Sequence, residues 1–128
     1  MIEINNLTSF AVDKKLFTAI AKKVLIGENK GKETLSLAFV SKEEIKKLNK
    51  KFRGKNKPTD VLSFELKEKE CLGEILICPE IVQEKKEDIR KVFIHGILHL
   101  LGYDHEKSKM EAEEMEKKEE KYLSKLKV

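Results

Sequence analysis

The residues best suited to chemistry in this sequence are its three histidines, which all fall within eleven positions. They are His95, His99 and His105, in the segment FIHGILHLLGYDH (93–105). His95 and His99 are four residues apart, so on a helix both imidazoles leave the same face, one turn apart. Gly102 follows, and a glycine can adopt the left-handed conformation that turns the chain back after a helix. We therefore expect His105 to return toward the other two rings.

Three neutral imidazoles that converge in this way suit one divalent metal ion. Zinc is bound tetrahedrally by nitrogen ligands, and three protein ligands with an open fourth position are typical of a catalytic site. Hydrogen-bonded histidines on a buried helix are the alternative, and the usual explanation of an isolated pair. Because every histidine belongs to one H-x3-H-x2-G-x2-H pattern, we favour one Zn²⁺ ion held by His95, His99 and His105.

The same spacing occurs in the metzincin protease signature H-E-x-x-H-x-x-G-x-x-H. Here the second position is Gly96, so the glutamate that acts as general base in peptide hydrolysis is missing. Three uncharged ligands also leave most of the +2 charge on the metal, which favours an anionic phosphodiester over a neutral amide. A metalloprotease therefore remains as the least favoured alternative.

A basic segment supports a substrate that carries phosphate. Seven cationic residues with no acid among them lie between positions 46 and 57, namely Lys46, Lys47, Lys50, Lys51, Arg53, Lys55 and Lys57. Lysines on a solvated loop are an equally good explanation of the run alone. Arg53 is one of only two arginines, and its guanidinium can bind a phosphate with two parallel hydrogen bonds.

The composition indicates one small domain, residues 1–128. A chain of 128 residues that is 40% hydrophobic can bury one core. It contains no apolar run long enough to span a membrane and no secretory signal, so we expect a cytoplasmic protein. Cys71 and Cys78 do not form a C-x-x-C pair, and we expect reduced, mostly buried thiols, with a disulfide as the alternative that some hyperthermophiles use.

Apolar periodicity predicts an α+β fold, in which a small mixed β-sheet of about four strands packs with about five helices. The expected strands are residues 2–4, 34–40, 61–66 and 74–78. The expected helices cover 13–27, a segment opened by the capping box of Ser41 and Glu44, a segment opened by Pro79, 89–101 and 107–126. Residues 51–60 have no apolar period and are predicted to be a loop. The metzincin-like metal site then lies at the end of the central helix 89–101.

Taken together, these residues resemble the YbeY family of bacterial metal-dependent endoribonucleases. HGILHLLGYDH (95–105) matches the family's H-G-x-L-H-L-x-G-Y-D-H, and FRGKNKPTDVLSF (52–64) matches its R-x-K-x-x-P-T-D-V-L-S-F block. LGEI (72–75) matches L-G-D-I, with Glu74 in place of aspartate. A second departure is Glu65, where the family often has proline.

The resemblance implies a zinc ion on His95, His99 and His105, and Arg53 as the important cation of the cleft. It implies a single-strand-specific endoribonuclease that takes part in 3′ maturation of 16S ribosomal RNA and in ribosome quality control. The expected mechanism uses a zinc-bound water, whose pKa falls to about 7, with Arg53 and His99 as catalytic residues. Asp104 is expected either to orient a ligand imidazole or to fix the turn.

The expected partners are single-stranded RNA and the small ribosomal subunit, and the expected state is a monomer. Two alternatives stay open. The first is a non-catalytic, ribosome-associated RNA-binding factor whose zinc is structural, which would require a fourth protein ligand. The second is the metalloprotease.

Overall fold

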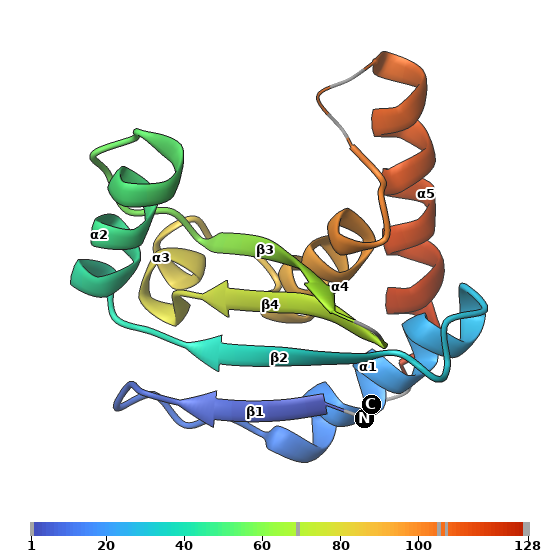
Figure 1. Cartoon of the computed structure of the whole chain (residues 1–128). Coiled ribbons are helices and arrows are strands. Elements are labelled where there is room, and N and C mark those ends of the chain that lie inside the picture. Colours follow the sequence, from blue (N-terminus) through green and yellow to red (C-terminus); the bar gives the residue numbers. More distant parts are fainter. Residues whose placement is uncertain (1, 69, 105, 107, 127–128) are drawn as a thin grey trace.

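The computed structural model of the chain describes residues 2–68, 70–104, 106 and 108–126. Four strands and five helices follow one another in the order shown in Figure 1. They are β1 (Ile2–Asn6), α1 (Lys14–Gly27), β2 (Thr34–Phe39), α2 (Lys42–Arg53), β3 (Val61–Glu68), β4 (Cys71–Ile77), α3 (Pro79–Glu84), α4 (Ile89–Leu100) and α5 (Lys109–Ser124). The predicted α+β class is confirmed.

The strands form one mixed sheet in the order β1-β2-β4-β3. β1 pairs with β2 and β2 pairs with β4 in parallel, whereas β3 runs antiparallel to β4. Within the described residues β3 is therefore an edge strand, with one side of its backbone not paired to another strand. This free edge becomes one wall of the cleft described below.

The main core lies between one face of the sheet and the helices α1, α4 and α5 (Figure 1). Phe17 of α1, Phe39 of β2 and Phe93 of α4 meet there in edge-to-face contacts, with ring centroids 5.1 and 5.4 Å apart. A second cluster on the other face joins Ile45 of α2 to Leu62 of β3 and neighbouring residues. Because α4 packs against both the sheet and α5, its exposed side is held in a fixed position.

α4 lies unusually close to the sheet at Gly96. A Cβ atom added there would lie 3.1 Å from Cγ2 of Ile75 and 3.4 Å from Oγ of Ser63. Position 96 therefore faces β3 and β4, and a larger side chain would push the helix away from the strands. A glutamate of the metzincin type does not fit this position, which weighs further against a protease.

Several element boundaries differ from the predicted ones. α2 continues through Arg53, which was predicted to lie in a loop, because Gly54 adopts φ 69° and caps the helix only after that residue. β4 begins at Cys71 instead of Glu74, since its first residues also pair with β2 and β3. α5 begins at Lys109, where the side chain of Ser108 accepts a hydrogen bond from a backbone N–H of the first turn.

Two further expectations concern the whole chain. Cys71 and Cys78 are free thiols, and Cys78 is buried, as predicted. Among the described residues, no helix combines the length and apolar character that crossing a membrane requires.

Candidate metal centre and active-site cleft

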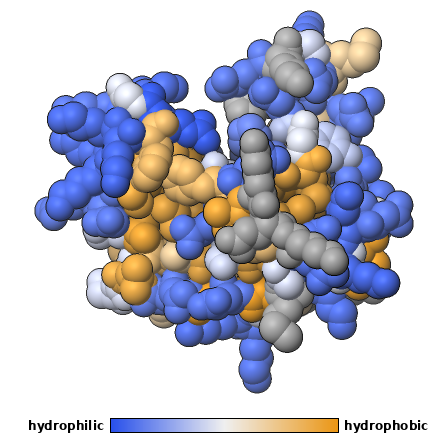
Figure 2. Space-filling view, viewed as in Figure 1, coloured by the Kyte–Doolittle hydropathy of each residue, from blue (hydrophilic) through white to orange (hydrophobic). Residues whose placement is uncertain are grey.

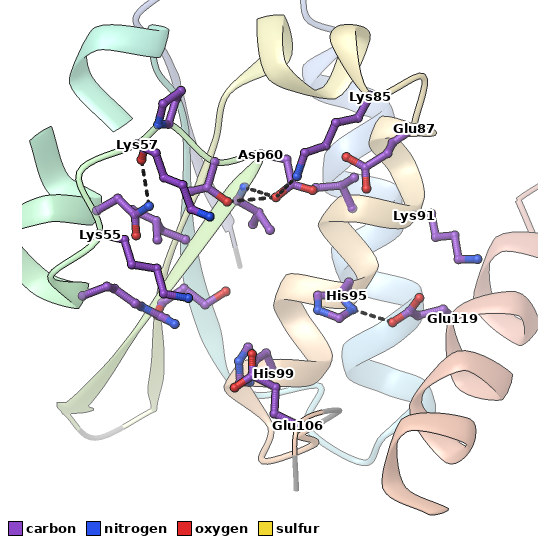
Figure 3. A pocket seen from close by; sticks show the side chains of 18 of the residues that line it. Lys55, Lys57, Asp60, Lys85, Glu87, Lys91, His95, His99, Glu106 and Glu119 are labelled. Atoms are coloured by element: carbon purple, nitrogen blue, oxygen red, sulfur yellow. Dashed lines mark hydrogen bonds and ion pairs between the residues drawn. The ribbon is translucent and has the colours of Figure 1, made fainter. Parts of the chain in front are cut away.

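A cleft of about 1080 Å³ lies between the end of α2, the free edge of β3, α4 and α5. Figure 2 shows that the surface is hollowed on this side, between two hydrophilic projections at α2 and at α5. One wall carries the cations Arg53, Lys55 and Lys57, and the opposite wall carries acids that include Glu116 and Glu119. Figure 3 shows the two histidines of α4 between these walls.

His95 and His99 both line this cleft, with ring centroids 6.2 Å apart. The predicted third ligand, His105, lies outside the described residues, so the three-histidine set stays a prediction. Among the residues that the structure describes, no three His, Cys, Asp or Glu side chains form a group that would hold a metal ion. Neither described cysteine therefore joins the histidine pair as a third ligand.

The two imidazoles are oriented through their Nδ1 atoms. Nδ1 of His99 lies 3.1 Å from the backbone oxygen of Tyr103, which can only accept a hydrogen bond, and Nδ1 of His95 lies 2.6 Å from Oε2 of Glu119. A neutral ring that donates from Nδ1 carries its lone pair on Nε2. Histidine ligands of metals are held in this way by carbonyl and carboxylate acceptors. The donor set present here therefore fits a zinc ion bound through Nε2.

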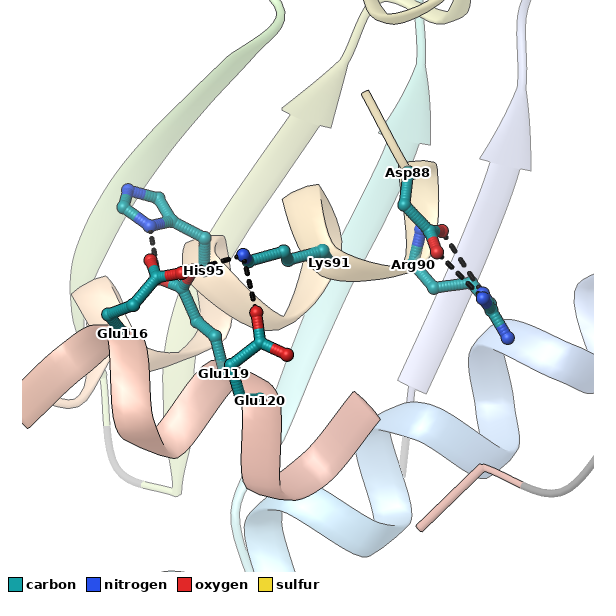
Figure 4. A network of polar contacts seen from close by, with 7 residues as sticks. All are labelled: Asp88, Arg90, Lys91, His95, Glu116, Glu119 and Glu120. Atoms are coloured by element: carbon teal, nitrogen blue, oxygen red, sulfur yellow. Dashed lines mark hydrogen bonds and ion pairs between the residues drawn. The ribbon is translucent and has the colours of Figure 1, made fainter. Parts of the chain in front are cut away.

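Glu119 is a site residue that the sequence alone did not predict, because it lies among the many charged residues of the C-terminal helix. It is only 5% exposed and lies against α4 (Figure 4). Its spacing from Met115 and Tyr122, which are both buried, places it on the side of α5 that packs against the core. The sequence signal for this residue is a glutamate that helical spacing places among buried apolar residues, since a carboxylate is buried only where it has a partner.

Lys91 fixes the position of Glu119 by joining α4 to α5. Its ammonium group donates hydrogen bonds of 2.8 Å to Glu116 and to Glu120, the neighbours of Glu119 along α5 (Figure 4). These two carboxylates raise the pKa of Lys91 above its ordinary value, so the lysine stays charged. The hydrogen bonds of Lys91 hold α5 against α4, so that the carboxylate of Glu119 lies beside the ring of His95.

We expect Glu119→Gln to weaken zinc binding by about 10- to 100-fold, because it removes the charged acceptor that orients the His95 ring through Nδ1. Competition with a chromogenic chelator measures this affinity. Glu113→Gln is the matched control, since Glu113 lies on the same helix, is exposed and does not border the cleft. Equal zinc affinity of the two variants would show that Glu119 has only a structural role.

The turn after α4 has the predicted conformation as far as it is described. Gly102 has φ 104°, its N–H donates to the carbonyl of His99, and the N–H of Tyr103 donates to the carbonyl of Leu98. Oδ1 of Asp104 accepts a hydrogen bond of 2.9 Å from the N–H of Glu106. This contact supports the expectation that Asp104 fixes the turn.

A buried carboxylate anchors the same turn to the rest of the protein. Glu28, at the end of α1, accepts hydrogen bonds from the hydroxyls of Tyr103 and Tyr122 and from the ammonium of Lys118. Burial alone would raise the pKa of Glu28, but these bonds outweigh it and lower the pKa below its ordinary value. Since the carbonyl of Tyr103 holds His99, the Glu28 cluster also helps to position that ring.

The basic wall is built from the end of α2 and the loop after it. Nη2 of Arg53 donates a 3.3 Å hydrogen bond to the carbonyl oxygen of Ser63 on β3. Asn49 is buried, and its side-chain amide donates a 2.8 Å hydrogen bond to the carbonyl of Lys57, which ties the loop to the helix. Of the predicted basic run, Arg53, Lys55 and Lys57 border the cleft, whereas the four lysines before Arg53 do not.

A carboxyl pair, Asp60 and Glu87, borders the cleft near the start of α4 (Figure 3). Asp60 accepts hydrogen bonds from Thr59 and from the N–H of Val61, which fix the turn before β3. Burial raises the pKa of Asp60, but hydrogen bonds and the nearby Lys85 outweigh it and lower the pKa. Partial desolvation, the hydrogen bond with Asp60 and its negative charge raise the pKa of Glu87 to about 7. Glu87 therefore holds a proton that the pair shares near neutral pH.

The shared proton makes stability depend on pH. The folded protein retains the proton of Glu87 up to a pKa of about 7, whereas the unfolded chain loses it near the ordinary pKa of 4.5. Stability from this group is therefore complete below pH 4.5 and is lost as the pH rises through about 7.

Glu87→Gln, which cannot lose a proton, should flatten this pH dependence. Glu87 is exposed, so we expect a gain of less than about 1 kcal/mol above pH 7. Thermal unfolding across pH measures it, with the exposed Glu43→Gln as matched control. A variant whose stability falls with pH as steeply as that of the parent would contradict the assignment.

The family model described as Endoribonuclease YbeY matches residues 3–127. The chain belongs to the YbeY family. Its YbeY match includes the three segments that carry the predicted site, namely 52–64, 72–75 and 95–105.

Individual YbeY proteins are similar over most of the chain. Endoribonuclease YbeY of Thermotoga maritima is 45% identical over 97 residues, which cover 70% of this chain and 65% of the relative. The chain thus matches just under two thirds of that relative's length. Endoribonuclease YbeY of Thermodesulfovibrio yellowstonii is 47% identical over 106 residues, covering 73% of this chain and 67% of the relative.

A solved structure has the same fold. The solution structure of TM1509 from Thermotoga maritima has a TM-score of 0.66 and 38% identity, covering 96% of this chain and 87% of that one. The arrangement of strands and helices around the cleft is therefore shared with an experimentally determined protein.

Proposed function

We propose that this YbeY-family protein is a zinc-dependent endoribonuclease that cleaves single-stranded RNA. The observation that carries the proposal is one cleft in which two Nδ1-anchored histidines face the cations Arg53, Lys55 and Lys57. RNA is the substrate that the name of the matching family and relatives specifies, and a polyanion suits this basic wall.

The histidines and the cations of the cleft have separate roles in this proposal. His95 and His99, with His105, would hold the zinc ion, which when bound supplies Lewis acidity and an activated water at neutral pH. Arg53 is placed to stabilise negative charge that develops on the phosphate, because its guanidinium borders the cleft and can donate two hydrogen bonds. Lys55 and Lys57 would hold the neighbouring phosphates of the strand.

The biological substrate that we propose is ribosomal RNA, with 3′ maturation of 16S RNA and ribosome quality control as the processes served. The protein would act as a cytoplasmic monomer on the small ribosomal subunit. These assignments rest on the resemblance to the YbeY family and on the affinity of a basic cleft for RNA.

Cleavage of single-stranded RNA by the zinc-loaded protein tests the proposal. Cleavage should stop on chelation and return on addition of zinc, while circular dichroism shows that the metal-free protein stays folded. RNA that remains intact after long incubation with the zinc-loaded protein would refute the enzymatic proposal.

The same experiment separates the two alternatives. A structural zinc predicts that chelation unfolds the protein, and it needs a fourth protein ligand. The described residues supply no group of three ligands, with or without a cysteine. A protease would digest an unfolded protein substrate, but Gly96 is buried against the sheet where a metzincin has its catalytic glutamate.

A further inference from the structure

Phe52 is a large aromatic side chain that the core does not use. It lies in the last turn of α2 and is 57% exposed, although it belongs to the segment that supplies the basic wall. Its ring makes an edge-to-face contact with Phe64 of β3, with centroids 5.3 Å apart. Phe64 in turn is partly buried against the cluster beneath α2. The exposed ring is therefore held in place without being covered.

The position of Phe52 relative to the cleft follows from strand alternation. Successive side chains of a strand point to opposite faces. Ser63 of β3 points toward Gly96 of α4, and its neighbour Phe64 points to the face covered by α2. Arg53 bonds the carbonyl of Ser63 while Phe52 contacts Phe64. The guanidinium and the exposed ring therefore lie on two sides of the same free strand edge.

Charge surrounds this ring. The ammonium group of Lys51 lies 5.2 Å from the centroid of Phe52, and the last turn of α2 also contains Lys50 and Arg53. Figure 2 shows an apolar area beside the hydrophilic surface at this end of α2. An apolar ring bordered by cations suits a ligand with alternating flat rings and anions, which describes single-stranded nucleic acid. A protein partner with an apolar patch has no comparable reason to need this many cations.

We propose that Phe52 is a stacking platform for one base of single-stranded RNA, next to the phosphate that Arg53 contacts. The strand would cross the free edge of β3, with its base on Phe52 and the adjoining phosphate in the cleft. This inference rests on the proposed function, which names RNA as the substrate, and adds a positioning residue outside the cleft. Stacking is indifferent to base identity, so Phe52 would hold the strand without selecting a sequence.

The test measures binding of a fluorescent oligouridylate and of an abasic ribose-phosphate strand of equal length. Both strands are titrated with the full-length protein, zinc-loaded and chelated, so that binding is measured with and without cleavage. Phe52→Ala should weaken binding of oligouridylate by about 5- to 150-fold, the usual range for losing one stacked base. It should leave the affinity for the abasic strand unchanged, and Phe52→Trp should bind oligouridylate at least as well as the parent.

Ile26→Ala is the matched control, because Ile26 is also 57% exposed and lies near the end of α1. It should change neither affinity. If Phe52→Ala folds poorly, Phe52→Leu replaces it in the test. Leucine keeps an apolar side chain on Phe64 but has no ring, so this variant should also lose most of the affinity for oligouridylate.

Two results would overturn the proposal. If Phe52→Ala weakens binding of both strands equally, Phe52 only supports Arg53. If it leaves the affinity for oligouridylate unchanged, Phe52 does not contact RNA. Because binding is measured separately from cleavage, either result can occur with RNA cleavage intact. A protein that binds RNA through Phe52 but cleaves none would instead refute the enzymatic proposal alone.

Discussion

His99→Ala should bind no stoichiometric zinc and cleave single-stranded RNA no faster than the chelated parent. His99 lines the cleft, and its Nδ1 is engaged by the carbonyl of Tyr103, so removing the ring removes an oriented ligand. Since enzymes accelerate their reactions by at least about 10⁶-fold, losing the metal should lower the cleavage rate by about 10³-fold or more. Elemental analysis and a time course of RNA cleavage measure the two effects.

The chelated parent is the reference for this variant, because both would lack metal in an otherwise folded protein. Thermal unfolding of His99→Ala should resemble that of the chelated parent, as a catalytic zinc site requires. A variant that keeps full zinc content, or that cleaves RNA at the parental rate, would remove His99 from the site.

Arg53→Ala should lower the turnover of RNA by about 10²- to 10³-fold, the usual loss for a donor that stabilises transition-state charge. Its guanidinium borders the cleft and is directed there by its hydrogen bond to the carbonyl of Ser63. Arg53→Lys should recover only part of the rate, because an ammonium group cannot donate two parallel hydrogen bonds to one phosphate. Single-turnover kinetics under saturating RNA measure the rate.

Lys47→Ala is the matched control for charge. Lys47 is an exposed residue of α2 that does not border the cleft. Its substitution removes one positive charge from the same helix and leaves the cleft unchanged. If Arg53→Ala changes RNA affinity and its salt dependence but not turnover, Arg53 is a phosphate anchor and has no catalytic role.

Local signals in the sequence predicted the elements that hold the site. Asp13 and Ser41 cap α1 and α2 through their side chains, and Gly102 turns the chain after α4 with a positive φ. Helical spacing alone placed His95 and His99 on one face, and both now border one cleft. These features depend on residues a few positions apart, where the physics of caps and periodicity is decisive.

Contacts between distant segments were not predicted, because no local pattern specifies them. Glu119 reaches His95 from 24 positions away, and Glu28 joins Tyr103 from 75 positions away. Both carboxylates lie in segments rich in exposed charge, where composition favours solvation. The helical position of Arg53 was also missed, since only the positive φ of Gly54 decides where α2 ends.

Three histidines are expected to share one zinc ion with an open fourth position, and X-ray absorption at the zinc edge measures this coordination shell. The zinc-loaded protein should contain one ion per chain, with three imidazole nitrogens and one water oxygen at about 2.0–2.1 Å. His105→Ala should lose one imidazole from that shell. A sulfur ligand at about 2.3 Å, four protein ligands, or a shell unaltered in His105→Ala would rule out this three-histidine site.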